Sequence, residues 1–295
     1  MNKKKSLFIF SGILVFAVLL IALITAIGTG QGGGFKKLPS GIEYKIVINK
    51  SKVKVQQGQL MQAFITYKTE KDSVVFSTYS SPKKSTVFPV EKPENIGDMN
   101  EAMLLLGAGD SAIFYLPSDS IFKNNAKRPA FAGKGSYIHV GIRVDTIMTK
   151  EDFSKMADIK AEEQKLIDDE LIKKYLADNN LKAEKTADGL YCVIEKPGTG
   201  PTAKPGNNVS VLYTGKLLDG VIFDSSEMGG GEPFKVKLGA NSVIKGWEQG
   251  LLFFNKGAKG LLLIPSYLAY GDHEYPGRIP ANSVLVFNIE VTNIK

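Results

Sequence analysis

The chain has few of the residues that enzymes most often use for covalent or metal chemistry. Its 295 residues include one cysteine, Cys192, and two histidines, His139 and His273. A single cysteine excludes an internal disulfide, and its apolar neighbours in "GLYCVIE" favour a buried strand position over a reactive thiol. The histidines lie far apart in sequence, without a second ligand at metal-site spacing. Zinc chemistry and a Ser/His/Asp triad are therefore poorly supported, and we expect neither a metal nor a cofactor.

The chain also lacks an arginine-rich stripe, although it is basic overall. Its net charge is +7 and its pI is about 9.1. The excess is mostly lysine scattered through the front half, without interleaved aromatic residues. Such scatter is typical of a solvated surface, so nucleic acid is not an expected partner. A hydrophobic content of 43% is ordinary for a globular protein, and the length allows about two domains.

The front end carries an apolar segment of membrane-spanning length. Residues 1–5, "MNKKK", precede an uncharged run over residues 6–27. As a helix this run is about 33 Å long, which covers a hydrocarbon core of about 30 Å. It exceeds the roughly 7–15 apolar residues of a secretory signal peptide. Because the lysines favour a cytoplasmic N-terminus, we expect residues 1–35 to anchor the chain in a membrane, with the rest of the chain on the far side. Cleavage of this segment, which would leave a soluble protein, is the alternative.

Residues 28–34, "GTGQGGG", contain a formal GxGxxG pattern. A dinucleotide-binding loop needs a short strand before it and an amphipathic helix after it. Here a membrane-length segment precedes the glycines and "FKKLPSG" follows them. The segment is therefore interpreted as a flexible tether.

The back half shows the pattern of an antiparallel sheet. Residues 208–213, "NVSVLY", alternate in polarity, and an Asp-Gly turn follows in "TGKLLDG". Residues 233–239, 259–265 and 283–294 predict further strands. Residues 243–254, "VIKGWEQGLLFF", are compatible with a short helix. The pattern predicts an α+β fold in which this helix packs across the sheet.

Five motifs in this half point to one family. "YTGKLLDGVIFDSS", "PFKVKLG", "VIKGWEQGL", "IPSYLAYG" and "IPANSVLVFNIEV" resemble, in order and spacing, the FK506-binding-protein (FKBP) family of peptidyl-prolyl isomerases. The resemblance covers residues 187–295 and implies a half-barrel of antiparallel strands around a short helix. It also implies catalysis of X-Pro bond rotation. An apolar pocket would favour the twisted amide over the planar one, without a nucleophile.

The resemblance implies a role for each residue of the pocket. Trp247 would form the floor beneath a proline ring. The Tyr270 hydroxyl and the Ile244 N–H would donate to substrate carbonyls. Asp224 would be a partly buried carboxylate that holds Tyr213 and acts on the twisted amide. The expected wall residues are Tyr213, Phe223, Phe234, Val243, Ile244, Ile279 and Phe287. Each aromatic alone could be ordinary core; the ordered set beside Asp224 favours a pocket.

Some positions depart from the family's usual pattern. The loop "SSEMGGGEPF" lacks the Arg that many members carry as the partner of the acid. Tyr275, expected to contact substrate, stands where many members have His, and Arg278 stands where an apolar residue is common. These changes affect the rim, and so the substrate preference and the affinity for a macrolide ligand of the FK506 type.

Residues 36–149 look like a divergent copy of the back half. Matching pairs are separated by 146 to 148 residues: Tyr67 and Tyr213, Phe76 and Phe223, Met99 and Trp247, Pro117 and Pro265. Met99 replaces the tryptophan, Ser77 is expected to replace Asp224, and no clear counterpart of Tyr270 follows Pro117. We therefore expect a second FKBP-like domain that is inactive. Polypeptide binding, packing on the second domain and dimerisation remain open as its role.

Residues 150–186 are expected to form a helical linker. Residues 150–180 contain neither glycine nor proline. Apolar residues recur at three- to four-residue steps: Leu166, Ile167, Leu171, Ile172, Tyr175 and Leu176. So short a stripe favours docking on a domain over a coiled coil.

The form "IPSYLAYG" resembles the bacterial branch of the family. The sequence thus predicts a prolyl isomerase of the bacterial envelope, anchored in the inner membrane with periplasmic domains, or soluble in the periplasm if the front segment is cleaved. Its expected partners are proline-containing segments of exported or envelope proteins. The alternative is a non-catalytic chaperone or adaptor that uses the same pocket to hold polypeptide.

Overall fold

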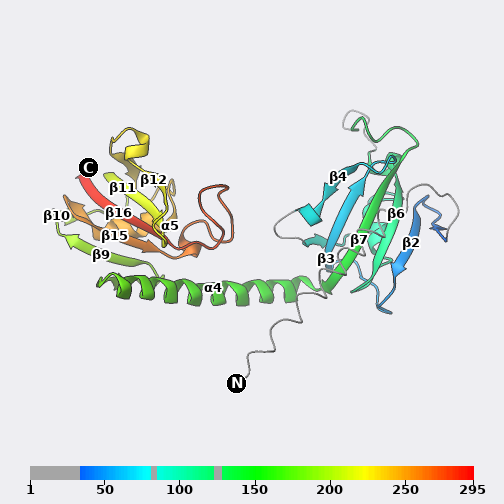
Figure 1. The fold of residues 1–295 in the computed structure, drawn as a ribbon, viewed down its shortest axis with the longest axis horizontal. Coiled ribbons are helices and arrows are strands. Elements are labelled where there is room, and N and C mark those ends of the chain that lie inside the picture. Colours follow the sequence, from blue (N-terminus) through cyan, green and yellow to red (C-terminus); the bar gives the residue numbers. More distant parts are fainter. Residues whose placement is uncertain (1–33, 81–84, 123–127) are drawn as a thin grey trace, which may run out of the picture. The chain divides into compact units, whose positions relative to one another are not determined.

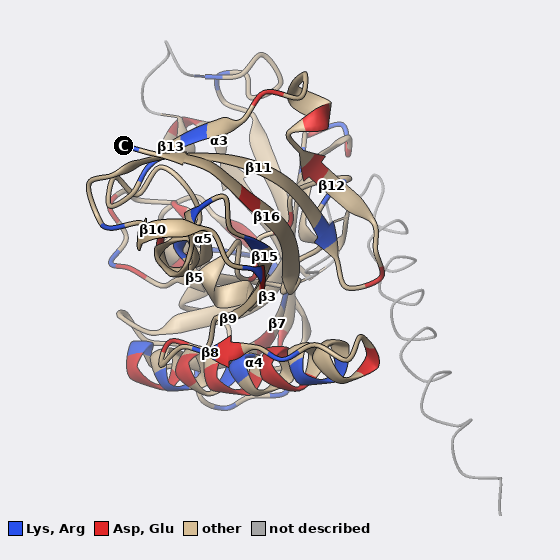
Figure 2. Cartoon of the chain, turned by 90° about the vertical axis from the view of Figure 1, so that its left-hand side faces the viewer, with Lys and Arg blue, Asp and Glu red and all other residues tan. Residues whose placement is uncertain are grey.

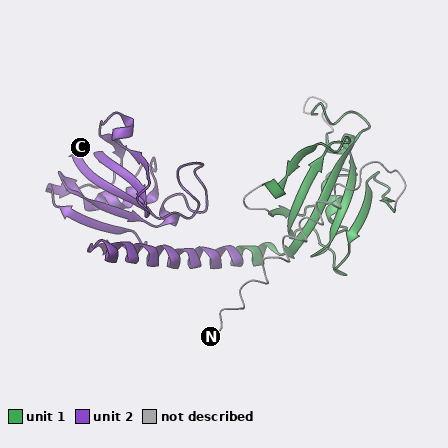
Figure 3. Cartoon of the chain, in the orientation of Figure 1, with its two compact units in different colours: residues 1–155 green, residues 156–295 purple. Residues whose placement is uncertain are grey.

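The computed structural model describes residues 34–80, 85–122 and 128–295 (Figure 1). The chain divides into two compact units, unit 1 (residues 1–155) and unit 2 (residues 156–295), shown in Figure 3. The expected membrane-spanning run over residues 6–27 lies outside the described residues. Among the helices that are described, none combines the length and apolar character needed to cross a membrane.

Unit 1 is built on an antiparallel sheet with the strand order β1-β2-β6-β7-β3-β4, and β5 also pairs with β3. Its strands are β1 (Lys36–Lys37), β2 (Glu43–Ile48), β3 (Leu60–Lys68), β4 (Val74–Ser77), β5 (Thr86–Pro89), β6 (Ser111–Pro117) and β7 (Tyr137–Met148). Its helices are α2 (Met99–Met103), α3 (Ser118–Ile121) and a short 3-10 turn, η1 (Thr78–Ser80).

Unit 2 has an antiparallel sheet with the strand order β12-β11-β16-β15-β9-β8, and β13 also pairs with β11. The strands are β8 (Glu184–Lys185), β9 (Tyr191–Lys196), β10 (Thr199–Thr202), β11 (Asn208–Leu217), β12 (Ile222–Ser225), β13 (Phe234–Lys237), β14 (Asn255–Lys256), β15 (Lys259–Ile264) and β16 (Leu285–Ile294). The helices are α4 (Lys150–Asp178), which begins in unit 1, and α5 (Lys245–Gly250), with 3-10 turns η3 (Glu227–Gly229), η4 (Leu251–Phe253) and η5 (Ser266–Leu268).

The two sheets share one topology. Read from the β4 and β12 ends, the order β4-β3-β7-β6-β2-β1 repeats as β12-β11-β16-β15-β9-β8, and β5 and β13 take the same place beside β3 and β11. A short helix, α2 or α5, precedes the equivalent strands β6 and β15 in each unit. The internal repeat expected from the sequence is therefore present as a repeated strand order.

Hydrogen bonds fix the register between the repeats and correct one expectation. In unit 1 the Ile65 N–H donates to Thr78 Oγ1 at 3.0 Å. In unit 2 the Tyr213 N–H donates to Ser226 Oγ at 2.9 Å. Ile65 therefore occupies the place of Tyr213, and the expected match of Tyr67 with Tyr213 is wrong by two residues.

The same register changes the residue that replaces the acid. Phe76 pairs with Tyr67, as Asp224 pairs with Gly215. Phe76, and not Ser77, therefore stands in the place of Asp224. The other sheet positions follow: Val75 stands for Phe223, Thr86 for Phe234 and Val140 for Phe287.

Two glycines let α5 lie close against β15. A Cβ on Gly246 would come within 2.4 Å of the Ile264 side chain, and one on Gly250 within 2.5 Å of the Leu262 side chain. Real Cβ atoms do not approach so closely, so only glycine permits this packing. The helix thereby brings Trp247, one residue after Gly246, into the buried core of unit 2.

The linker helix α4 docks on unit 2 through its second half. Ile172 and Leu176 are buried in one cluster with Leu261 and Leu263 of β15. Tyr175 of the expected apolar stripe also packs against this cluster. The three earlier members of the stripe do not belong to it: Leu166, Ile167 and Leu171 are 69%, 52% and 41% exposed. Acidic and basic residues alternate along the rest of the helix (Figure 2), and several form ion pairs one turn apart.

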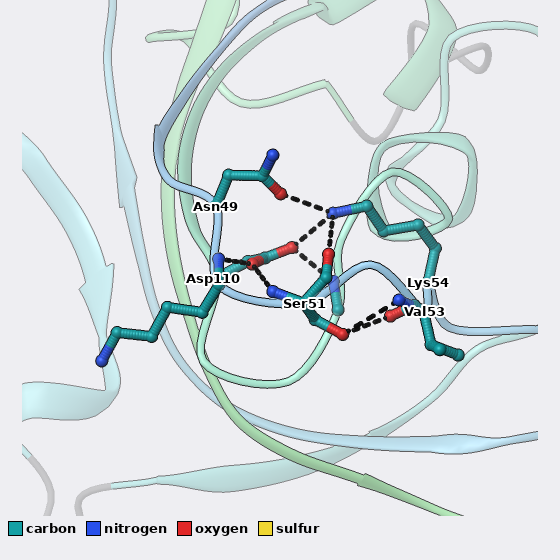
Figure 4. A network of polar contacts seen from close by, with 7 residues as sticks. Asn49, Ser51, Val53, Lys54 and Asp110 are labelled. Carbon is teal, nitrogen blue, oxygen red and sulfur yellow. Dashed lines mark hydrogen bonds and ion pairs between the residues drawn. The ribbon is translucent and has the colours of Figure 1, made fainter.

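A buried carboxylate organises the loop that follows β2 in unit 1 (Figure 4). Asp110 is fully buried. It accepts from the backbone N–H groups of Lys50, Ser51 and Gly107 at 2.7, 3.0 and 2.8 Å, and from Lys54 Nζ at 2.7 Å. Burial alone would raise the pKa of this carboxyl, but these donors together hold the pKa below its usual value.

Candidate active site

A cavity of about 440 Å³ lies in unit 2 where the predicted pocket residues meet. It is formed by β11, β12, β13, α5 and β16 and by the loops before α5 and after η5. Its lining residues are Tyr213, Asp224, Phe234, Asn241, Ser242, Val243, Ile244, Trp247, Tyr270 and Phe287. All but Asn241 and Ser242 were expected from the sequence, and the expected floor, acid and tyrosine donor line one space.

Trp247 forms an apolar floor held by neighbouring rings. Its side chain is 4% exposed. Tyr213, Phe287 and Phe234 meet it edge to face, with ring centroids 5.0, 5.3 and 6.0 Å away. Edge-to-face contacts restrict ring rotation and favour one arrangement. The floor is thus an apolar surface held in place by three aromatic rings.

Tyr213 and Asp224 form the polar edge of the cavity. The Tyr213 hydroxyl donates to Asp224 Oδ2 at 2.8 Å. Burial raises the pKa of the Tyr213 phenol, and the hydrogen bond to Asp224 raises it further. The tyrosine therefore keeps its proton at neutral pH and fixes the carboxylate against the cavity wall.

Tyr270 supplies a hydroxyl at the cavity mouth. Its side chain is 40% exposed. Burial of the ring raises the pKa of this phenol, and the nearby Asp224 charge raises it further. The hydroxyl is therefore a hydrogen-bond donor over the whole neutral range. Tyr275 lies beside it with ring centroids 6.1 Å apart, outside the cavity lining and half exposed.

The backbone of Ile244 presents a second donor. Ile244 is the N-cap of α5, and its carbonyl accepts from the N–H groups of Trp247 and Glu248. Within the described residues its own N–H has no acceptor. The first N–H groups of a helix lack partners inside the helix, so this donor is available to a ligand in the cavity.

The structure separates some expected wall residues from the cavity and adds others. Phe223 and Ile279 are 7% and 4% exposed and belong to the core, not to the cavity lining. Phe223 supports the wall from behind, with its ring edge-on to Phe287 at 5.6 Å. Asn241 and Ser242 line the cavity. Only their position just before the helix-forming run could have indicated this.

A second hollow, of about 650 Å³, shares one side with the first. Both are lined by Tyr213, Asp224 and Phe234, and the second also includes Met228 and Arg278. Met228 is 69% exposed. The loop after β12, whose sequence departs from the family pattern, thus borders a space adjoining the pocket.

The single cysteine takes no part in this site. Cys192 is 3% exposed within the core. Burial raises the pKa of its thiol to about 12, and the charge of Glu184 adds to the shift. A thiol with so high a pKa is a poor nucleophile at neutral pH. The buried strand position expected from the sequence is confirmed, in β9.

The site is arranged for binding and electrostatic work on an uncharged group. It offers an apolar floor, one carboxylate and two hydrogen-bond donors in the lining of one small cavity. Such a cavity can take up an apolar ring, exclude water from an adjoining amide, and hold neighbouring carbonyls.

Comparison with known proteins gives matches over the same part of the chain. Residues 200–292 match the family model described as "FKBP-type peptidyl-prolyl cis-trans isomerase". FK506-binding protein 4 of Chaetomium thermophilum is 47% identical over 111 residues, which are 38% of this chain and 22% of that protein. The FKBP-type peptidyl-prolyl cis-trans isomerase FkpA of Aeromonas hydrophila is 46% identical over 123 residues, 41% of this chain and 44% of that protein.

A solved structure gives a partial match as well. The crystal structure of FkpA from Escherichia coli aligns with 34% identity over 50% of this chain and 68% of that chain, with a TM-score of 0.39. The chain spans less than half of the length of the two curated relatives above. The likeness to these two therefore concerns only part of each relative.

Proposed function

We propose, from the match of residues 200–292 to the FKBP-type peptidyl-prolyl cis-trans isomerase family, that unit 2 catalyses rotation about X-Pro peptide bonds. One observation carries the proposal most directly. Trp247, Tyr213, Asp224 and Tyr270 line a single cavity of about 440 Å³.

The geometry suits the chemistry of the rotation. A peptide bond resists rotation by about 18–20 kcal/mol because amide resonance keeps it planar. Water stabilises the polar planar amide more than the twisted one. A proline ring seated over Trp247 would bring the X-Pro bond into an apolar space, where that preference is lost.

The polar groups would position the substrate and favour the twisted state. The Tyr270 hydroxyl and the Ile244 N–H would each donate to a substrate carbonyl and so hold the chain on both sides of the rotating bond. The Asp224 carboxylate, fixed by Tyr213 at 2.8 Å, would act on the amide dipole as it turns. No covalent intermediate is required.

The proposed substrates are proline-containing segments of exported or envelope proteins. The support for this location is the uncharged run over residues 6–27 after a lysine cluster. The same cavity is the proposed site of a macrolide of the FK506 type.

Fractionation tests the membrane anchor. Recovery of the full chain in the inner-membrane fraction is expected, and recovery in the soluble periplasmic fraction would refute an uncleaved span.

Unit 1 is proposed to lack isomerase activity. Phe76 stands for Asp224, Ile65 for Tyr213 and Met99 for Trp247, so neither the acid nor its tyrosine is kept. A specific observation favours polypeptide holding as its role. Phe76 and Ile96 are 49% and 76% exposed, and Val75 beside Phe76 is 45% exposed. Phe76 stands for Asp224 and, by the spacing of 148 residues, Ile96 stands for Ile244, and both of these line the cavity of unit 2. A chaperone or adaptor role is therefore the second candidate function.

A peptide assay tests the proposal. The full chain is added to a short proline-containing peptide, and cis-to-trans conversion is followed by a protease-coupled signal. We expect acceleration over the uncatalysed rate, which is slow because the bond isomerises in tens of seconds or longer. A rate equal to the uncatalysed one would refute the proposed isomerase activity and leave polypeptide holding as the candidate function.

A further inference from the structure

The linker helix α4 carries a buried acid that contacts the loop leading to Tyr270. Asp168 is fully buried. Its Oδ2 accepts from both the N–H and the Oγ of Ser266, each at 2.7 Å. Its Oδ1 accepts from Gln164 Nε2 at 2.7 Å. A buried carboxylate is costly unless its oxygens are satisfied, so this arrangement holds Ser266 firmly.

Ser266 in turn holds both neighbours of Tyr270. Its carbonyl accepts from the Ala269 N–H at 2.9 Å and from the Gly271 N–H at 2.8 Å. Gly271 has a left-handed φ of +62°, and its carbonyl accepts from the Asn282 N–H. Two backbone bonds to one carbonyl fix the short segment between them, and Tyr270 is the residue in the middle.

The contact involves unit 2 alone. The equivalent of Ser266 in unit 1, by the common spacing of 148 residues, is Ser118. The Ser118 N–H donates to the Ser136 carbonyl and its Oγ to the Gly133 carbonyl, so no carboxylate is used there. In the same spacing Phe122, which has no hydroxyl, stands for Tyr270. Among the described residues, a carboxylate therefore binds this serine in the unit that has a tyrosine four residues later.

We propose that Asp168 is a positioning residue for isomerisation: through Ser266 it sets the place of the Tyr270 hydroxyl over the prolyl cavity. The linker helix is then part of the catalytic unit. The inference rests on the proposed function, because Tyr270 is assigned its role there.

The test is a double-mutant cycle on the full chain. Asp168→Ala is expected to lower kcat/KM for a proline peptide about tenfold, as displacement of a positioned group does. In a Tyr270→Phe background the same change should cost less than about twofold, because the hydroxyl that it aims is gone. Equal losses in both backgrounds would overturn the inference and leave a purely structural contact.

Two further variants separate positioning from folding. Asp169 is the matched control, because it binds Lys173, Tyr191 and Lys185 but does not contact Ser266. Asp169→Ala should lower the unfolding temperature while kcat/KM changes less than about twofold. Asp168→Asn keeps the shape and one acceptor, and should restore part of the activity that Asp168→Ala loses. If Asp168→Asn is as inactive as Asp168→Ala while its unfolding temperature is normal, the hydrogen bond to Ser266 is not what positions Tyr270.

Amide hydrogen exchange gives a readout that does not need activity. Residues 266–271 should exchange faster in Asp168→Ala than in the parent chain, while Asp169→Ala should leave them unchanged. If the parent chain does not isomerise peptides, the proposed function fails, and exchange alone decides whether Asp168 holds this loop. Unchanged exchange in Asp168→Ala would overturn the inference even in an active enzyme.

Discussion

The Tyr213 hydroxyl donates a 2.8 Å hydrogen bond to Asp224 Oδ2 at the edge of the cavity that Trp247 lines. Both side chains also line the adjoining hollow. The pair therefore holds the only described carboxylate of the cavity in one orientation. The hydrogen bond and the charge are separable by mutation.

Asp224→Asn is expected to keep an acceptor for Tyr213 and to remove the charge. It should lower kcat/KM about tenfold or more, because the charge acts only as the amide twists. Tyr213→Phe removes the hydrogen bond and should also lower stability by about 1 kcal/mol. Peptide isomerisation assays measure the change in kcat/KM of both variants, and thermal unfolding measures the change in stability. Full activity of Asp224→Asn would mean that the carboxylate has only a structural role.

The second prediction compares the two floors. Trp247→Leu leaves an apolar residue but loses the ring surface beneath the substrate, so kcat/KM should fall at least about tenfold. Met99→Leu, the matched change in unit 1, should leave kcat/KM within about twofold. Peptide kinetics on the full chain measure both. Equal losses from the two units would contradict the proposal that only unit 2 is active.

The fold and most of the cavity could be predicted from the sequence, because alternation and the five motifs are local patterns. The register of the repeat could not. Matching identical residues in the sequence aligns Tyr67 with Tyr213. The equivalent hydrogen bonds made by the Ile65 and Tyr213 N–H groups show instead that Ile65 is the counterpart of Tyr213. Side chains alternate between the two faces of the sheet along a strand, so two strands can share residue types without sharing the same register. The contact of Asp168 with Ser266 was also hidden, because 98 residues separate them.

A third prediction concerns the glycine opposite the acid. A Cβ on Gly215 would lie 2.7 Å from Phe287 Cε1 and 2.8 Å from Phe223 Cε2. Gly215→Ala should therefore displace these rings, lower the stability of unit 2 by about 1–3 kcal/mol and lower kcat/KM, since Phe287 lines the cavity. The position has tyrosine, Tyr67, in unit 1, where valine replaces Phe287.

Gly229→Ala is the control for this change. Nothing lies within 4 Å of a Cβ there, although Gly229 borders the adjoining hollow. Its unfolding temperature and kcat/KM should match those of the parent chain. If Gly215→Ala behaves in the same way as Gly229→Ala, the rings behind the cavity are more mobile than their packing indicates.

The last prediction tests unit 1 through Asp110. Asp110→Asn keeps the shape but sets an amide NH₂ against backbone N–H donors, so unit 1 should lose about 2–4 kcal/mol of stability at neutral pH. The pKa of this carboxyl is lowered by folding, so its stabilisation is present above the unfolded value of about 3.9 and is lost as pH falls through the folded value. The variant should lack this part of the acid sensitivity.

Amide exchange of β2 and β6 measures the effect on unit 1. Fluorescence of the single tryptophan, Trp247, reports on unit 2 and should be unchanged. Normal protection of β2 and β6 in Asp110→Asn would show that this network does not stabilise the unit.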